Sequence, residues 1–323
     1  MKKLFALTLC VALLLTLFAG CGAETQQETQ PTEPTEEVLQ ESPEEAKVLK
    51  ILIIGSSRSV NTFHMLYEAF KDQMPDQELV LGVVYYSGCS MTMHRNFTVN
   101  NEYVYDFYCN TNGIWEISPG YNMDACLKAH NWDVVQIQAG NGDLNNKVNL
   151  ECRTFLRDYI DKLVEHPHQL WWHSTWFNST DPALYGISPT KLHPEDIDQY
   201  AQITANHEAV KEYVFNDPMF AGRITSGTPM MYALKVLEVP EVELYRDHTH
   251  LSDFGCLLVA YSWYAQYTGN PVTEIGIDVI PAEKRQKYYR NLGDLEVTEE
   301  MKQVILKTVD YTLKNPWSVP AKE

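Results

Sequence analysis

Residues 47–59, KVLKILIIGSSRS, contain the clearest structural signal in the chain. Its unbroken apolar run before Gly55 is typical of a strand that is buried on both faces of a parallel sheet. Gly55 permits a sharp exit from that strand, and a hydroxyl just after it would lie above the sheet near the start of a helix. Such small residues also fit a plain tight turn or an anion site, so this stretch alone leaves the chemistry open.

Strands and helices alternate through the rest of the chain. Further strands are expected at 78–86, 133–138, 169–173 and 222–226, and helices at 61–74, 150–165, 195–213, 252–267 and 299–313, the first with Asn61 as its N-cap. This alternation predicts an α/β fold whose parallel sheet is covered by helices on both faces. Such sheets bind ligands beyond the carboxyl ends of their strands, where two long polar and aromatic insertions fall, at 87–121 and 176–194.

The charge of the chain limits its partners. The 323 residues carry a net charge of -18, and from residue 48 onward 35 acidic residues oppose 22 basic ones. A polyanion would be repelled by this excess, so nucleic acid is excluded as a partner. Since no stretch rich in Pro or Gly divides the chain after residue 48, we expect 48–323 to form a single domain.

The first 47 residues predict export. Two lysines precede an apolar run at 4–19, which is shorter than the roughly 20 residues of a spanning helix, so 1–20 is interpreted as a cleaved signal. The ending FAGC, residues 18–21, resembles the lipobox of bacterial lipoproteins, which implies that Cys21 is acylated. Residues 21–47 carry eight glutamates and few apolar groups, which predicts a disordered acidic tether. We expect a protein that is lipid-anchored to the outer face of a bacterial cell membrane, with ordinary secretion as the alternative.

Five cysteines remain beyond Cys21, and an odd number cannot pair completely. Cys89 and Cys109 lie in one irregular stretch and could form a disulfide, although spacing alone leaves the pairing among Cys89, Cys109, Cys126, Cys152 and Cys256 open. No Cys or His spacing in the chain is typical of structural zinc.

A second polar motif, RDHTHLSDFG, occupies residues 246–255. A carboxylate three residues before an imidazole can fold back to accept its Nδ1 hydrogen bond, which leaves Nε2 free to take a proton from a serine. Asp247 and His250 have this spacing. The alternatives are a solvated polar loop or a metal site built from Asp247, His248 and His250.

The two motifs together resemble the SGNH (GDSL-type) hydrolase superfamily, in which a first-strand Gly-x-Ser supplies the nucleophile and a late Asp-x-x-His its partners. Within it the chain looks like an uncharacterised bacterial branch, a domain of unknown function of the 4886 type. The matching segments are 50–57, 88–90, 132–135, 171–176, 226–228 and 246–255.

This resemblance implies a flavodoxin-like three-layer α/β/α fold and assigns roles by position. Ser57 would be the nucleophile, His250 the general base and then acid, and Asp247 the group that orients His250. The backbone N–H groups of Ser57 and Gly88 would form the oxyanion hole. The resemblance implies no cofactor and no metal.

Two departures from the family pattern stand out. Ser56 occupies a position where the superfamily favours Asp or Asn, and Arg58 stands where the branch usually has an aromatic residue. The third block, usually Gly-x-Asn-Asp, reads QAGNGD at 138–143, so the side-chain oxyanion donor is either Asn141 or Gln138. A non-catalytic descendant therefore remains an alternative.

Aromatic residues gather around the predicted site. They are Trp171, Trp172, His173, Trp176 and Phe177 near the fourth strand, and Tyr103, Tyr105, Tyr108 and Trp115 in the first insertion. Packing accounts for most of them, but exposed Trp and Tyr faces also stack on sugar rings. We predict substrate contacts from Trp176, His173 and Arg58.

The predicted function is a cell-surface serine esterase that removes a small acyl group, acetyl first, from a carbohydrate or similar polar substrate through an acyl-enzyme. Activity should fall as His250 takes up a proton, near the reference histidine pKa of about 6.5. Two alternatives remain: a surface lipoprotein that binds a glycan or solute in a degenerate cleft, and an O-acyltransferase that uses the same residues.

Overall fold

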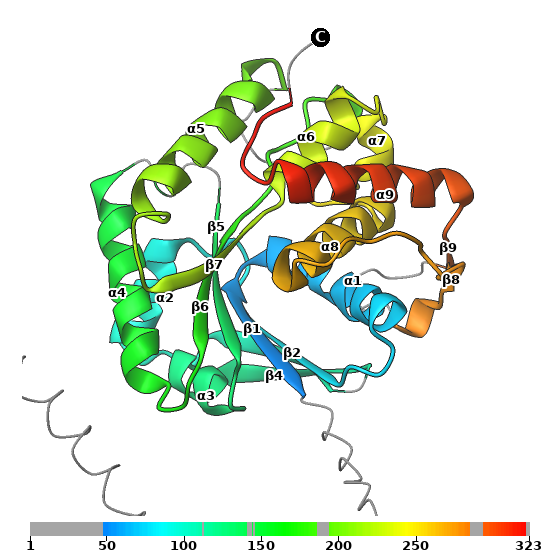
Figure 1. Ribbon diagram of the computed structural model, residues 1–323. Coiled ribbons are helices and arrows are strands. Elements are labelled where there is room, and N and C mark those ends of the chain that lie inside the picture. Colours follow the sequence, from blue (N-terminus) through cyan, green and yellow to red (C-terminus); the bar gives the residue numbers. More distant parts are fainter. Residues whose placement is uncertain are drawn as a thin grey trace, which may run out of the picture. The chain divides into compact units, whose positions relative to one another are not determined.

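The computed structural model describes residues 48–111, 113–140, 144, 146–185, 194–284 and 293–320 (Figure 1). The predicted signal, the acylated Cys21 and the tether all lie outside these residues. None of the helices in the described segments is long and apolar enough to cross a membrane.

A seven-stranded sheet forms the centre, in the order β4-β3-β2-β1-β5-β6-β7. Its strands are β1 (Leu49–Gly55), β2 (Leu79–Tyr85), β3 (Tyr105–Thr111), β4 (Ile114–Tyr121), β5 (Val134–Ala139), β6 (Gln169–Ser174) and β7 (Phe220–Thr225). Strands β2, β1, β5, β6 and β7 are parallel, in the 2-1-3-4-5 order of one common doubly wound sheet. The expected α/β fold with a mostly parallel sheet is confirmed, and β1 lies at the point where the winding reverses.

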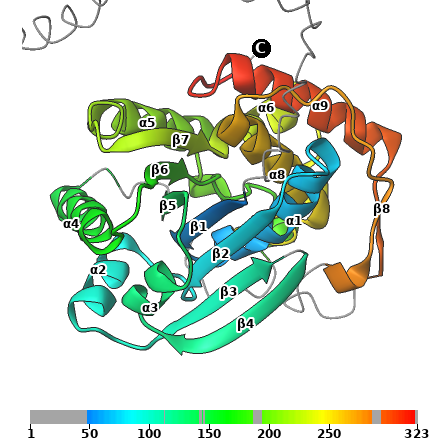
Figure 2. The same cartoon turned by 60° about the horizontal axis from the view of Figure 1, so that its bottom comes forward.

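The first insertion differs from the purely parallel expectation. Residues 87–121 contain α2 (Met91–Val99) and the hairpin of β3 and β4, which continues the sheet in antiparallel pairing. The hairpin turn includes Gly113 at φ +86°, a conformation that suits glycine. The sheet is therefore mixed, and β4 forms its exposed edge (Figure 2).

Helices cover both faces of the sheet (Figures 1 and 2). One layer contains α1 (Ser57–Gln73), α6 (Gly227–Lys235), α8 (Asp253–Thr268) and α9 (Glu299–Lys314), and the other contains α2, α3 (Met123–Lys128) and α4 (Lys147–Leu163). Helix α5 (Gln199–Tyr213) lies beside β7, and α7 (Glu241–Leu244) precedes the loop of residues 245–252. Short strands β8 (Val279–Ile280) and β9 (Leu295–Glu296) pair separately. Helix α8 is apolar nearly all round because it is enclosed between α1 and α9.

Strand β1 joins the two cores. Ile51 and Ile53 belong to the core on the α1 and α8 side, whereas Leu52 and Ile54 belong to the other. All four side chains are fully buried. The period-two alternation of a strand thus explains why an unbroken apolar run was needed.

The start of α1 corrects one prediction. Asn61 is not the N-cap: the helix begins at Ser57, and Ser56 is its N-cap in extended conformation. The apolar periodicity starts only at Val60, so the small polar first turn carries no hydrophobic signal. The helix therefore begins one turn earlier than the pattern predicts.

All five cysteines in the described residues are free thiols, so the disulfide considered for Cys89 and Cys109 is not formed. Burial raises the pKa of the Cys89 thiol to about 12.

Candidate active site

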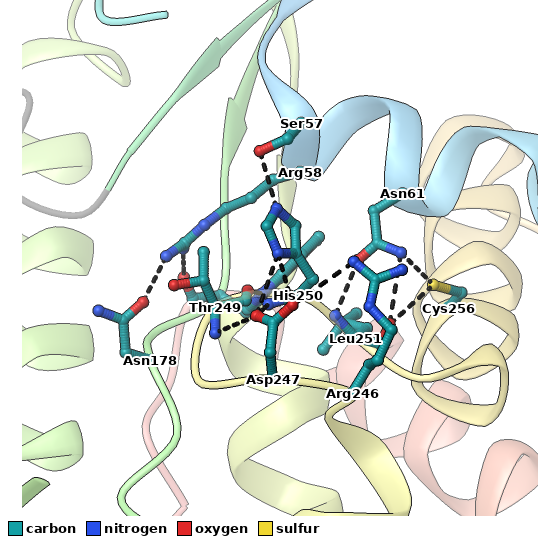
Figure 3. Close-up of polar contacts among 11 residues, drawn as sticks. Ser57, Arg58, Asn61, Asn178, Arg246, Asp247, Thr249, His250, Leu251 and Cys256 are labelled. Atoms are coloured by element: carbon teal, nitrogen blue, oxygen red, sulfur yellow. Dashed lines mark hydrogen bonds and ion pairs between the residues drawn. The ribbon is translucent and has the colours of Figure 1, made fainter. Parts of the chain in front are cut away.

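Ser57, His250 and Asp247 meet at the carboxyl edge of the sheet (Figure 3). His250 Nε2 lies 2.9 Å from Ser57 Oγ. On the other side of the ring, Nδ1 lies 3.0 Å from both carboxylate oxygens of Asp247. These residues, 193 positions apart at the serine and histidine, form a continuous hydroxyl, imidazole and carboxylate array.

Ser57 is the first residue of α1, directly above β1. The N–H groups in the first turn of a helix have no intrahelical acceptor, and the helix dipole adds positive potential there. Ser56 does not cap them with its side chain. The Ser59 N–H donates to the Ser56 carbonyl at 3.0 Å, so the feature of this turn that suits an anion is the positive potential next to the Ser57 hydroxyl.

Gln138, at the end of β5, fixes this turn from below. Its Oε1 accepts hydrogen bonds from the Ser56 N–H at 3.2 Å and from the Ser59 hydroxyl, and its Nε2 donates to Ser56 Oγ at 3.1 Å. A Cβ at Gly55 would overlap Ser59 Oγ and lie 2.6 Å from Gln138 Oε1, so the strand end accepts only glycine without a shift. Gln138 holds the turn in place, and its oxyanion role stays a prediction.

Gly88 follows β2, which pairs with β1 so that Gly55 is opposite Tyr85. The two neighbouring strands therefore end at the same edge of the sheet, where Ser57 and Gly88 follow them. Gly88 has φ +62°, and a Cβ there would meet nothing, so the backbone conformation rather than space favours glycine. Its place in the oxyanion hole stays a prediction; Asn141, the other predicted donor, lies outside the described residues.

Asp247 is held as a carboxylate by its own loop. Its Oδ1 also accepts the backbone N–H groups of Thr249 at 2.9 Å and His250 at 2.8 Å. Burial alone would raise the pKa of Asp247, but the hydrogen bonds and charge of His250 and the bond from Thr249 outweigh it, and the pKa lies well below its usual range. A charged acceptor therefore faces His250 Nδ1 at neutral pH.

Two predicted substrate contacts are wrong. Trp176 and His173 are both fully buried. Trp176 donates through Nε1 to the Thr249 carbonyl at 2.8 Å, and His173 Nε2 lies 2.8 Å from Ser226 Oγ with its ring against Trp263. Burial, followed by the charge of Arg58, lowers the pKa of His173 to about 3. Both side chains pack the site from behind and offer no face to a ligand.

Arg58, the third predicted contact, is half-buried, and its side chain forms hydrogen bonds with other residues of the same chain. Its guanidinium donates to Thr175 Oγ1 at 3.2 Å and to the Trp176 carbonyl, and it donates to Asn178 Oδ1 at 2.6 Å (Figure 3). It also lies over the Trp176 ring at 5.6 Å. Arg58 thus ties the first turn of α1 to the segment after β6, and contact with a substrate stays a prediction.

That segment in turn supports the candidate catalytic loop, residues 245–252. The Ser179 N–H donates to the His248 carbonyl at 2.9 Å, and the His248 N–H donates to the Leu184 carbonyl at 3.0 Å. The His248 ring stacks on Tyr185, with centroids 5.0 Å apart. His248 is therefore engaged away from the carboxylate of Asp247, and the searched residues hold no cluster of three His, Cys, Asp or Glu side chains suited to a metal.

Two supporting residues, Glu241 and Asn61, are not predicted as such from the sequence. Glu241 accepts the Thr180 N–H at 2.6 Å, Thr180 Oγ1 at 2.8 Å and Gln199 Nε2 at 3.1 Å, and so holds the segment after β6. Burial alone would raise its pKa, but hydrogen bonds led by Ser179 lower it. Nothing in the sequence near Glu241 indicates these contacts. Asn61 binds the backbone of Leu251, and its position four residues after Ser57, on the same helix face, was the available signal.

A cavity of about 460 Å³ lies away from this array, at the amino ends of β1, β5 and β6. Leu49, Asp133, Trp171 and Tyr267 are among its lining residues. The parallel strands separate it from Ser57, so it takes no part in the candidate active site.

The fold and the array define an α/β protein with a serine, histidine and aspartate at the carboxyl edge of its sheet. The chain belongs to the DUF4886 family, a domain of unknown function, whose sequence model matches residues 50–287. The resemblance to this branch is therefore confirmed. No curated protein matches the sequence.

Two solved structures are similar. A DUF4886 family protein from Bacteroides uniformis shares 20% identity, with a TM-score of 0.69, over 85% of this chain and 98% of the other. BT4096, a gut microbial diltiazem-metabolizing enzyme, shares 12% identity, with a TM-score of 0.44, over 83% of this chain and 64% of the other. The first likeness shows a common fold.

Proposed function

We propose that this protein is a serine hydrolase of the SGNH type that cleaves carboxylic esters through an acyl-enzyme. The observation that carries the proposal is the continuous contact from Ser57 Oγ through His250 to Asp247, at 2.9 Å and 3.0 Å. The same array stands at a helix start beyond the carboxyl end of β1, where doubly wound sheets bind their ligands.

In the first half-reaction, Ser57 Oγ attacks the ester carbonyl while His250 Nε2 takes the hydroxyl proton. His250 Nδ1–H remains bonded to Asp247, whose charge stabilises the imidazolium. The tetrahedral oxyanion would accept hydrogen bonds from the N–H groups of Ser57 and Gly88, each typically worth about 2.7–4 kcal/mol to the transition state. His250 then donates its proton to the leaving alkoxide, and the alcohol departs.

In the second half-reaction, water replaces the alcohol. His250 removes a proton from water, the hydroxide attacks the acyl-Ser57 carbonyl, and the proton returns to Ser57 Oγ as the acid leaves. These steps use His250 twice as base and twice as acid, and they require no cofactor.

The proposed substrate is a small acyl ester, acetyl first, of a carbohydrate or other polar neutral molecule. The acidic excess after residue 48 disfavours anionic substrates. Of the four insertion aromatics named above, Tyr103 is exposed and Trp115 half-buried, whereas Tyr105 and Tyr108 are core residues. Tyr103 is therefore the one that leaves most of its ring open to stack on a sugar. Export and acylation of Cys21 complete the proposal of a cell-surface enzyme.

A fluorophosphonate probe tests the proposal because it reacts with a serine that an adjacent base activates. We expect one label per chain, located at Ser57 by mass spectrometry, and no label on Ser57→Ala. The control Ser318→Ala, distant in sequence at the end of the described chain, should label like the wild type. Absence of labelling on folded wild type would instead favour the binding lipoprotein.

A competing alcohol separates hydrolysis from acyl transfer. Turnover of an acetyl ester by the wild type with added alcohol should yield mainly free acetate if water is the preferred acceptor. An acetylated alcohol as the dominant product would assign the same residues to an O-acyltransferase.

A further inference from the structure

Helix α1 carries a second polar side chain one turn below the serine. Asn61 is 2% exposed. Its Oδ1 accepts the N–H of Leu251 at 2.8 Å, and its Nδ2 donates to the Leu251 carbonyl at 3.4 Å and to Cys256 Sγ at 3.0 Å (Figure 3). The carboxamide thus binds both backbone groups of one residue, which neither a carboxylate nor an aliphatic side chain can do.

The position of this residue pairs it with the nucleophile. Ser57 and Asn61 are separated by four positions and so lie on the same face of α1. Their partners, His250 and Leu251, are consecutive residues of the catalytic loop. One face of α1 therefore contacts two successive loop residues. Ser57 contacts the side chain of His250, and Asn61 contacts the backbone of Leu251.

Some of the other hydrogen bonds hold the loop to the segment after β6, among them those of Trp176 and Ser179, and others shape it internally. The Arg246 N–H donates to the His250 carbonyl at 2.9 Å, Tyr245 and Leu251 form an isolated β-bridge, and Asp247 binds the His250 N–H. These bonds preserve the Asp247–His250 couple, but they do not set its distance from α1. Asn61 connects the loop directly to the helix that carries Ser57.

We propose that Asn61 is a positioning residue that holds His250 Nε2 within hydrogen-bonding reach of Ser57 Oγ. The inference rests on the proposed esterase function for its kinetic consequence, although the positioning itself is a structural statement. A displacement of about 1 Å between reacting groups can lower the rate about 100-fold. The effect should fall on kcat, because Asn61 is buried beneath the reacting groups and has no access to a substrate.

The test compares Asn61→Leu, which has a similar size but no polar atoms, with Asn61→Asp, which keeps the acceptor for the Leu251 N–H. For hydrolysis of a chromogenic acetyl ester, we expect Asn61→Leu to lower kcat by about 10- to 100-fold with KM within about threefold. Asn61→Asp should retain more activity than Asn61→Leu. In a crystal structure of either variant, the distance between Ser57 Oγ and His250 Nε2 should follow the order of the kcat values.

Two controls isolate positioning from general destabilisation. Met65→Ala removes a fully buried apolar side chain from the same helix; it should lower the melting temperature and leave kcat at 25 °C unchanged. Cys126→Ala removes a fully buried thiol from the other core, away from Asn61, and it should also keep kcat.

An unchanged kcat in folded Asn61→Leu, or an unchanged Ser57–His250 distance, would overturn the inference. If Asn61→Leu does not fold, Asn61→Asp decides through the same two measurements. An inactive wild type would contradict the proposed function, whereas a displaced His250 in the variant structure would still support the positioning role.

Discussion

Two contacts of His250 differ in origin: Asp247 lies near it in the chain, whereas only the fold brings it to Ser57. Asp247 and His250 are three residues apart and are joined by both side-chain and backbone hydrogen bonds. Their pairing could be predicted from spacing because a single loop turn suffices to form it. The contact with Ser57 spans 193 positions and could be predicted only through the family resemblance.

Substitution of Asp247 tests its assigned role beside His250. Asp247→Asn removes the charge that stabilises an imidazolium and lets the amide hold His250 in the wrong tautomer. We expect kcat for a chromogenic acetyl ester to fall roughly 10⁴-fold with little change in KM. Asp161→Asn, at an exposed position of α4, is the matched control, and a loss below tenfold in Asp247→Asn would contradict the assigned role.

The wrong predictions at the scale of single residues share one cause. His173 and Trp176 have the residue types of a binding cleft, but His173 is buried against Trp263 and Ser226, and Trp176 is buried and bonded to the Thr249 carbonyl. Whether an aromatic side chain faces solvent depends on what covers it, and residue type alone does not contain that information. Arg58 is likewise turned toward the protein, by its bond to the Trp176 carbonyl.

At the scale of elements, the junction of β1 and α1 is the decisive unit. Its strand was predicted correctly because the apolar run is too short for a buried helix and ends at a glycine. Its helix start was misplaced because the turn of Ser57, Arg58 and Ser59 lacks apolar residues. The hairpin of β3 and β4 was missed because β4 is exposed along most of its length and has no clean alternation.

Substitution of Gly55 tests this junction. Gly55→Ala places a Cβ against Ser59 Oγ and 2.6 Å from Gln138 Oε1, so the turn must shift. We expect the free energy of unfolding in urea to fall by about 1–3 kcal/mol, together with a loss of esterase activity. Gly293→Ala, where a Cβ meets nothing, should leave both quantities unchanged; equal behaviour of the two variants would show that the junction tolerates displacement.

At the scale of the whole molecule, buried histidines couple stability to pH. Burial, as the leading cause, lowers the pKa of His94 and His207 to about 4 and that of His173 to about 3. In the unfolded chain, histidines titrate near about 6.5. As the pH falls below that value, the unfolded chain binds protons that the folded protein excludes, so the free energy of unfolding decreases until the folded pKa values are reached.

His207→Gln should make this pH dependence shallower. Each such histidine contributes a slope of about 1.4 kcal/mol per pH unit between the two pKa values, and the variant lacks one of them. Urea unfolding of wild type and variant at pH 6 and pH 5 measures the difference. His166→Gln, at a half-exposed loop histidine, is the control, and parallel slopes for wild type and His207→Gln would contradict the account.

The direction of β1 has a practical consequence for anyone who attaches this protein to a surface. The strand begins at Leu49, and Ser57 follows its far end, about 20 Å away at 3.3 Å per residue. A bead or sensor chip coupled upstream of Val48 meets the domain at the opposite rim from Ser57. Immobilisation through that end leaves Ser57 facing the bulk solution.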